Sequence, residues 1–161
     1  MVKGLILVGS GLDGFQLSGS MSPTLAAYVK ALQGGDIEQA LERSLQIFTD
    51  GERRQSGQVN PVARERTRIM SAPLFARPQV SEAVPHGHTP PARERLGEIH
   101  VPTLAIVGSE DNAMMHDIAA LFVDHIPGSK SVVIPDAGHH PNLEHPELFN
   151  EIVANFLKEI E

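Results

Sequence analysis

A cluster of histidines near the C-terminus is the part of the sequence best suited to chemistry. In the segment DAGHHPNLEHPELFN, His139, His140 and His145 lie within seven residues of one another. A neutral imidazole can bind a metal ion or act as a general base, and histidines also occur in solvated turns. Each role needs different partners, so residues elsewhere in the chain decide among them.

An aspartate in a second segment is the best partner for one of these histidines. Asp111 follows the apolar run VPTLAIVG, and His139 follows the shorter run SVVIP. Both are expected in loops at the carboxyl ends of buried strands, where open α/β sheets bind their ligands. An aspartate there can bond one imidazole nitrogen, which fixes the tautomer and leaves the other nitrogen as the base. We therefore expect the two side chains within about 2.6–3.2 Å of each other.

The other histidines are assigned simpler roles. A zinc site would need His139 and His140 together with His86 or His88, but the HGH spacing suits no helix face and no carboxylate is placed with it. We expect no metal ligand and no cofactor. His140 is expected to be a loop or rim residue, and His145 is expected at a helix start that faces solvent.

Three short apolar runs predict the strands that carry these loops, at residues 4–9, 101–108 and 131–135. A helix is predicted after the second strand and another after the third. Their apolar faces are expected to contain Met115, Ile118, Leu121, Phe122 and Ile126 in the first helix, and Leu148, Ile152, Phe156 and Leu157 in the second. Strands that alternate with helices indicate an α/β fold with a short parallel sheet of three strands.

The segment between the first two strands, residues 12–98, has a different pattern. Helix starts are predicted at Ser22, Asp36 and Asn60, whose side chains suit the N-cap position. Gly51 is predicted to end the second of these helices. The later run VPHGHTPPARERLG is rich in proline and is predicted to be a connector. No strand is predicted here, so the segment is expected to be a helical insertion.

The polar loops resemble the C-terminal half of the α/β-hydrolase superfamily. VGSEDN is similar to the loop that carries the family's aspartate, which falls on Asp111. DAGHHPNLEHP is similar to its histidine loop, with Gly138 and His139 followed by Glu144 and Pro146. The run GLILVG resembles the sixth strand of that fold, which precedes a lid in many members.

The resemblance implies both an architecture and a pair of site residues. Residues 1–11 and 99–161 would form the C-terminal half of a partial α/β-hydrolase core, and residues 12–98 would form a helical lid. His139 would be the general base of a Ser-His-Asp triad and Asp111 the acid that orients it.

The nucleophile of that family is missing from this sequence. It stands in a Gly-x-Ser-x-Gly elbow, and no serine here has glycine both two residues before and two residues after it. Ser10, at the end of the first strand, is expected to cap a turn and not to bond the free nitrogen of His139. The resemblance implies that the first five strands, the elbow and the oxyanion-hole loop would precede Met1.

Composition excludes several classes of function. The net charge of −7 argues against nucleic-acid binding, which depends on basic patches. The lack of cysteine removes thiolate nucleophiles and zinc–thiolate sites, and it fits a reducing compartment. No apolar run is long enough for a secretory signal or a membrane span. We expect a cytoplasmic protein that binds neither nucleic acid nor membrane.

Two functions remain open on the sequence. One is a serine hydrolase that cleaves an ester, a lactone or a carbon–carbon bond of a small molecule. The other is a non-catalytic binding or assembly module derived from a hydrolase half-fold. In both cases strand 4–9 is apolar on both faces and has no charge or proline to protect its edge. We expect a second copy or a complementing N-terminal half to pair there, in preference to coverage by the lid helices, so the chain is not expected to be a monomer.

Overall fold

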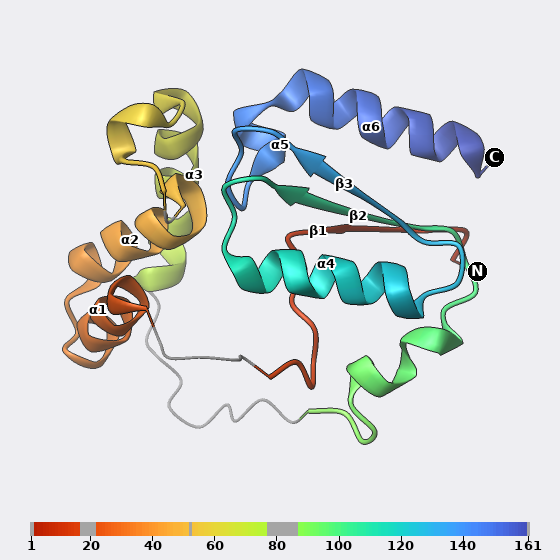
Figure 1. The fold of residues 1–161 in the computed structure, drawn as a ribbon. Coiled ribbons are helices and arrows are strands. Elements are labelled where there is room, and N and C mark those ends of the chain that lie inside the picture. The colour runs from red at the N-terminus through yellow and green to blue at the C-terminus, as the bar shows by residue number, and fades with distance from the viewer. Residues whose placement is uncertain (1, 17–21, 52, 77–86, 161) are drawn as a thin grey trace.

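The computed structural model describes residues 2–16, 22–51, 53–76 and 87–160 (Figure 1). Three parallel strands form one sheet in the order β1-β2-β3. Their bounds are β1 (Leu5–Val8), β2 (Thr103–Gly108) and β3 (Lys130–Ile134). The predicted strands and the predicted α/β class with a short parallel sheet are confirmed.

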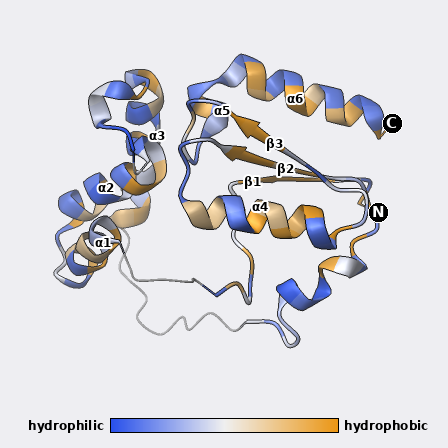
Figure 2. Ribbon diagram, in the orientation of Figure 1, coloured by the Kyte–Doolittle hydropathy of each residue, from blue (hydrophilic) through white to orange (hydrophobic). Residues whose placement is uncertain are grey.

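One helix covers each face of the sheet, as Figure 1 shows for α4 (Ala113–His125) and α6 (Pro146–Glu159). Successive residues of a strand point to opposite faces. Ala105 and Val107 therefore pack with α4, while Leu104 and Ile106 pack on the side of α6. Both layers are apolar, and Figure 2 colours most of the strand residues as hydrophobic. Every residue of β2 is buried, which makes it the centre of the core.

The buried face of α6 differs from the predicted one. Leu148 is 38% exposed and Leu157 is 46% exposed, so neither lies in the core. Ile152 and Phe156 do pack against the sheet, as predicted. The other contacts come from residues outside the predicted set, namely Phe149, Val153 and Ile160. The prediction chose a stripe rotated from the one that meets the sheet. On α4 the prediction holds more closely, because Met115, Ile118, Phe122 and Ile126 are buried and Leu121 is partly buried.

The segment between β1 and β2 is helical, and its first helices lie beyond the carboxyl ends of the strands in Figure 1. Its α-helices are α1 (Pro23–Gln33), α2 (Ile37–Leu45) and α3 (Pro61–Phe75). The predicted N-caps are confirmed, because the side chains of Ser22, Asp36 and Asn60 each accept a bond from a backbone amide of the first turn. No strand occurs among the described residues of this segment.

A π-helical turn, η1 (Gln46–Asp50), continues α2 and ends at Gly51. The predicted stop at Gly51 is confirmed, since this residue has a φ of 77°. Arg64 on α3 holds the turn in place through two hydrogen bonds to the buried Asp50 carboxylate, at 2.8 and 3.1 Å. The bonds to Asp50 raise the pKa of Arg64 above its usual range. A short 3₁₀ turn, η2 (Ser56–Gln58), leads from there to α3.

The predicted connector is only partly irregular. Its last residues form a 3₁₀ helix, η3 (Ala92–Glu98), and Leu96 packs into the core beside α4. Residues 84–86 of the connector lie outside the described residues. A four-residue helix, α5 (Pro141–Glu144), precedes α6. None of the helices in the described ranges has the length and apolar character needed to cross a membrane.

Candidate active site

The two polar loops meet because the ends of β2 and β3 are tied together. The Ser109 amide donates to Ile134 O at 2.8 Å, and the Glu110 amide donates to Ala137 O at 2.8 Å. Gly108 is required at this point, since a Cβ atom there would collide with the carbonyl oxygens of Ala137 and Gly138. Parallel pairing thus brings a loop that starts near residue 109 against one that starts near residue 136.

Asp111 and His139 form a hydrogen-bonded pair between these loops. The distance from His139 Nδ1 to Asp111 Oδ2 is 2.8 Å, which confirms the expected approach. The Asp111 side chain has no exposed surface, and its Oδ1 accepts from the Asn112 amide at 2.8 Å and from Asn112 Nδ2 at 3.2 Å. Both carboxylate oxygens therefore have donors. A carboxylate held in this way keeps the Nδ1–H tautomer of the ring and leaves Nε2 free to accept a proton.

The imidazole of His139 lies in a narrow slot. Its own backbone amide donates to Phe48 O at 2.8 Å, and the Phe48 ring lies 5.2 Å from the imidazole, between centroids. On another side the ring meets Gly9, where an added Cβ would stand 2.8 Å from Cε1. Gly9 has a φ of 49°, which favours glycine. The lack of a side chain also leaves room for the imidazole ring. The sequence marked Gly9 only as the end of a strand.

His139 lines a pocket of about 380 Å³ whose remaining walls come mainly from helices α1 to α3 and η1. Five of the lining residues are large and mainly apolar, namely Tyr28, Leu32, Phe48, Leu74 and Phe75. Ser44, Thr67 and Ser71 add aliphatic hydroxyl groups to the phenolic hydroxyl of Tyr28. The described lining contains no Asp, Glu, Lys or Arg side chain. Beyond the helical pattern, no feature of the sequence indicated this set, because the lining depends on how the helices dock.

His140 is closer to the site than the sequence predicted. It lines the same pocket as His139, and the two rings lie 5.3 Å apart, between centroids. Burial, and then the neighbouring His139, lower the pKa of His140. His140 lies in a loop, as predicted, but it also forms part of the pocket wall and stays neutral to lower pH.

Acid is expected to destabilise the fold through His140. Because its folded-state pKa is lowered from 6.5, the unfolded chain binds more protons there between that lowered pKa and 6.5. The free energy of unfolding then falls as the pH falls through this window, by at most about 1.4 kcal/mol per pH unit. Urea unfolding of the wild-type chain and of His140→Gln across the window measures the difference. An identical pH dependence in the two proteins would contradict the role given to His140.

The remaining sequence candidates take lesser places. Within the described ranges no hydrogen bond joins Ser10 or any other serine to His139. His145 lies at the start of α6, as predicted, with its Nε2 3.4 Å from Asp136 O. No group of three His, Cys, Asp or Glu side chains in the described part could hold a metal ion, and His86 lies outside that part.

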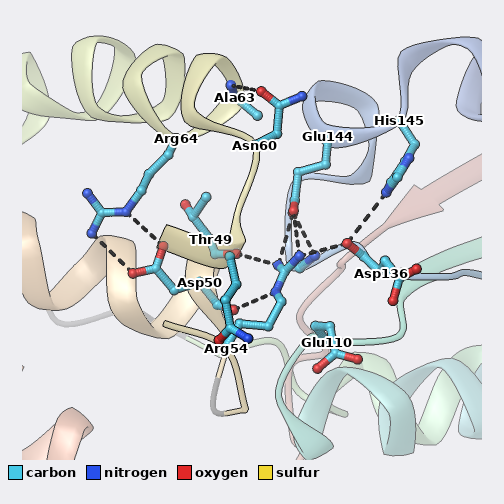
Figure 3. A network of polar contacts seen from close by, with 12 residues as sticks. Thr49, Asp50, Arg54, Asn60, Ala63, Arg64, Glu110, Asp136, Glu144 and His145 are labelled. Carbon is cyan, nitrogen blue, oxygen red and sulfur yellow. Dashed lines mark hydrogen bonds and ion pairs between the residues drawn. The ribbon is translucent and has the colours of Figure 1, made fainter. Parts of the chain in front are cut away.

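The structure adds two residues to the site, Arg54 and Glu144 (Figure 3). Both bond to the backbone of the loop that carries His139. Glu144 was visible in the sequence as part of the HHPNLEHP pattern. Arg54 was missed, because nothing distinguishes it from the other arginines of the helical segment.

Comparison with known proteins finds matches that cover nearly the whole chain. The model of a family described as "Alpha/beta hydrolase family" matches residues 2–152. The pimeloyl-acyl-carrier protein methyl ester esterase of Yersinia enterocolitica is 29% identical over 166 residues, covering 98% of this chain and 61% of the relative. A 2-hydroxy-6-oxononadienedioate/2-hydroxy-6-oxononatrienedioate hydrolase of Klebsiella pneumoniae is 40% identical over 63 residues, covering 39% of this chain and 22% of the relative.

A solved structure gives the same result. Est816, described as an N-acyl homoserine lactone degrading enzyme, matches with a TM-score of 0.69 at 26% identity, over 96% of this chain and 57% of its own. This chain therefore spans less than two thirds of the length of the relatives that it matches over nearly its whole extent.

Proposed function

This chain belongs to the alpha/beta hydrolase family, and we propose that it carries the base and the orienting acid of a serine hydrolase. The observation that supports this most strongly is the 2.8 Å bond between His139 Nδ1 and the fully buried Asp111 carboxylate, beside an apolar pocket. In this proposal a serine attacks a carbonyl carbon, and His139 Nε2 takes the serine proton. Asp111 stabilises the imidazolium that forms, and His139 then gives the proton to the leaving group.

The serine of this mechanism comes from outside these 161 residues in our proposal. The sequence contains no Gly-x-Ser-x-Gly elbow, and the backbone strain of that elbow is what exposes the serine in this fold. The relatives are longer than this chain, which is consistent with a nucleophile on additional polypeptide.

We propose a small-molecule ester, lactone or carbon–carbon bond as the substrate. Relatives carry names for a methyl ester, a lactone and a dienedioate. At about 30 Å³ per water, the 380 Å³ pocket holds about a dozen water molecules, and small-molecule sites start near about 300 Å³. Since its described lining is apolar and hydroxylated, it suits an uncharged acyl group. Residues 12–98 would act as the lid that supplies these walls.

The open edge of β1 supports a partner. In the described part, β1 pairs only with β2. We propose that a second copy or a nucleophile-bearing N-terminal half adds strands there. The missing elbow equally supports the alternative function, a non-catalytic binding or assembly module that retains the half-fold.

An ester-hydrolysis assay distinguishes the two functions. The chain is assayed with p-nitrophenyl butyrate alone, and then co-expressed with an α/β-hydrolase N-terminal half that carries a Gly-x-Ser-x-Gly elbow. We expect turnover only in the pair, and we expect His139→Ala to lower it by about 10²–10⁴-fold, the usual contribution of a general base.

Each other outcome has a definite meaning. A folded pair without turnover favours the binding module. Turnover of the pair that survives His139→Ala contradicts the role of His139. Turnover by the chain alone, with a serine that reacts with a fluorophosphonate, contradicts the external nucleophile.

A further inference from the structure

Arg54 connects the helical segment to the loop that carries His139. Its guanidinium donates to two carbonyls of the preceding turn η1, Asp50 O and Thr49 O, both at 2.8 Å. It also donates to Asp136 O at 2.6 Å and forms two bonds with the Glu144 carboxylate, at 2.8 and 3.4 Å. Figure 3 shows Arg54 between these groups. The side chain is only 12% exposed, so nearly all of its donors are used inside the protein.

Glu144 in turn restrains Gly138, the residue before His139. Its carboxylate is 2% exposed, and Oε1 accepts from the Gly138 amide at 2.6 Å. The next amide, that of His139, donates to Phe48 O at 2.8 Å. η1, Arg54 and Glu144 therefore hold the backbone from Asp136 to His139 at three points, in addition to the bonds that Asp136 and Ala137 make with Ser109 and Glu110.

The loop also has little room to move. A Cβ atom on Gly138 would stand 2.5 Å from Thr49 O and 3.1 Å from Arg54 Nη2. The turn η1 is itself fixed to α3 by the bonds between Asp50 and Arg64. The restraint on His139 thus extends through Arg54 into the helical segment and not only into the sheet.

We propose that Arg54 and Glu144 are positioning residues that hold the backbone of His139 so that its Nδ1 meets Asp111. A planar guanidinium has five donors in a fixed geometry and can bond a carboxylate and several carbonyls at once, whereas an ammonium has only three donors and an apolar side chain has none. A buried ion pair is seldom more stabilising than well-packed apolar residues. Stability alone therefore does not explain the Arg54–Glu144 ion pair, whereas directional placement of the histidine loop does. The catalytic purpose of this placement rests on the proposed function, but the measurement of the His139 tautomer that tests the placement does not.

The adjacent residue provides a matched control. Arg53 donates to Ser109 O at 2.6 Å and pairs with Glu110 at 3.2 Å, on the loop of Asp111, but its side chain is 70% exposed. Replacing Arg53 or Arg54 by Met removes the same charge from neighbouring positions. Only Arg54→Met removes the bonds to Asp136 and Glu144.

The tautomer of His139 tests the proposal without any turnover. NMR of the ¹⁵N-histidine-labelled chain distinguishes Nδ1–H from Nε2–H rings, and the His139 signal is assigned by its loss in His139→Gln. Free imidazole rings favour Nε2–H, so Nδ1–H reports the bond to Asp111. We expect Nδ1–H in the wild-type chain and in Arg53→Met. In Arg54→Met we expect the ratio of Nδ1–H to Nε2–H to fall at least tenfold, and in Arg54→Lys to fall by less.

A purely structural role would predict other results. If Arg54→Met and Arg54→Lys lower the melting temperature but leave His139 as Nδ1–H, the proposal is overturned. If Arg54→Met does not fold, the same measurement is made on Arg54→Met/Glu144→Gln, where no unpaired carboxylate is buried, and on Arg54→Lys. An unchanged tautomer in both would again overturn it. Failure of the hydrolysis assay would leave this result intact, so the two proposals can fail separately.

Discussion

Replacing Asp111 by Asn is expected to lower kcat by about 10⁴-fold in a hydrolase assembled with this chain, the loss that the same change causes in a Ser-His-Asp triad. Asp111 Oδ2 accepts from His139 Nδ1 at 2.8 Å. The amide of Asn can present its NH₂ group to Nδ1, which then becomes the acceptor. Nε2 would carry the proton and could no longer take one from serine. The KM should change much less, because Asp111 is buried behind His139 and does not line the pocket.

Glu110→Gln is the matched control for this variant. It also removes one carboxylate from the same loop, but Glu110 pairs with the exposed Arg53 and does not touch His139. We expect kcat to stay within a few-fold of wild type, since exposed ion pairs contribute about 0–1 kcal/mol. Steady-state kinetics of both variants in the co-expressed pair measure the difference. If the two lose the same activity, or if Asp111→Asn retains more than a tenth, Asp111 does not orient the base.

The strands and the Asp–His pair could be predicted because each depends on short-range pattern and simple topology. GLILVG, VPTLAIVG and SVVIP are apolar over a strand length and are bounded by glycine or proline. Parallel strands place their carboxyl ends at one edge, so Asp111 and His139 had to meet if both followed neighbouring strands. The ladder from β2 to β3 supplies that condition.

The rotation of α6 could not be predicted from the same kind of pattern. Its sequence contains apolar residues on more than one stripe, including Leu148, Phe149, Val153 and Leu157. Contact with the sheet decides which stripe is buried, and that contact selects Phe149 and Val153. Periodicity identifies the helix but leaves several rotations of similar apolar content.

The roles of Arg54 and His140 could not be predicted from the sequence, for a related reason. Both acquire their roles from the docking of residues 22–76 onto the carboxyl ends of the strands, through contacts that span up to 90 positions in the chain. Local pattern has no information about such contacts. An arginine in a polar segment such as GERRQSG is most simply interpreted as a solvated side chain, and only the fold shows that Arg54 is buried while Arg53 is exposed.

The open edge of β1 leads to the second large effect. The Leu5 amide donates to Pro102 O at 2.9 Å and the Gly9 amide to Ile106 O at 3.0 Å. In a parallel ladder the bonding residues alternate, so the backbone groups of Ile6 and Val8 point away from β2. A strand that pairs with this edge would use the Ile6 amide. Proline is tolerated on an edge strand when its nitrogen faces outward, so Ile6→Pro should preserve the pairing with β2.

Ile6→Pro is therefore expected to raise the dissociation constant of the assembly about 10–100-fold. It removes one donor and leaves a carbonyl of the partner strand unpaired, which costs about 1–3 kcal/mol. Light scattering and sedimentation at micromolar concentration give the constant. Ile6→Ala is the control, because it also loses the side chain that packs beside α6 but keeps the amide; its assembly should match that of the wild type. A wild-type monomer, with fast exchange of the Ile6 and Val8 amides, would show instead that this edge has no partner.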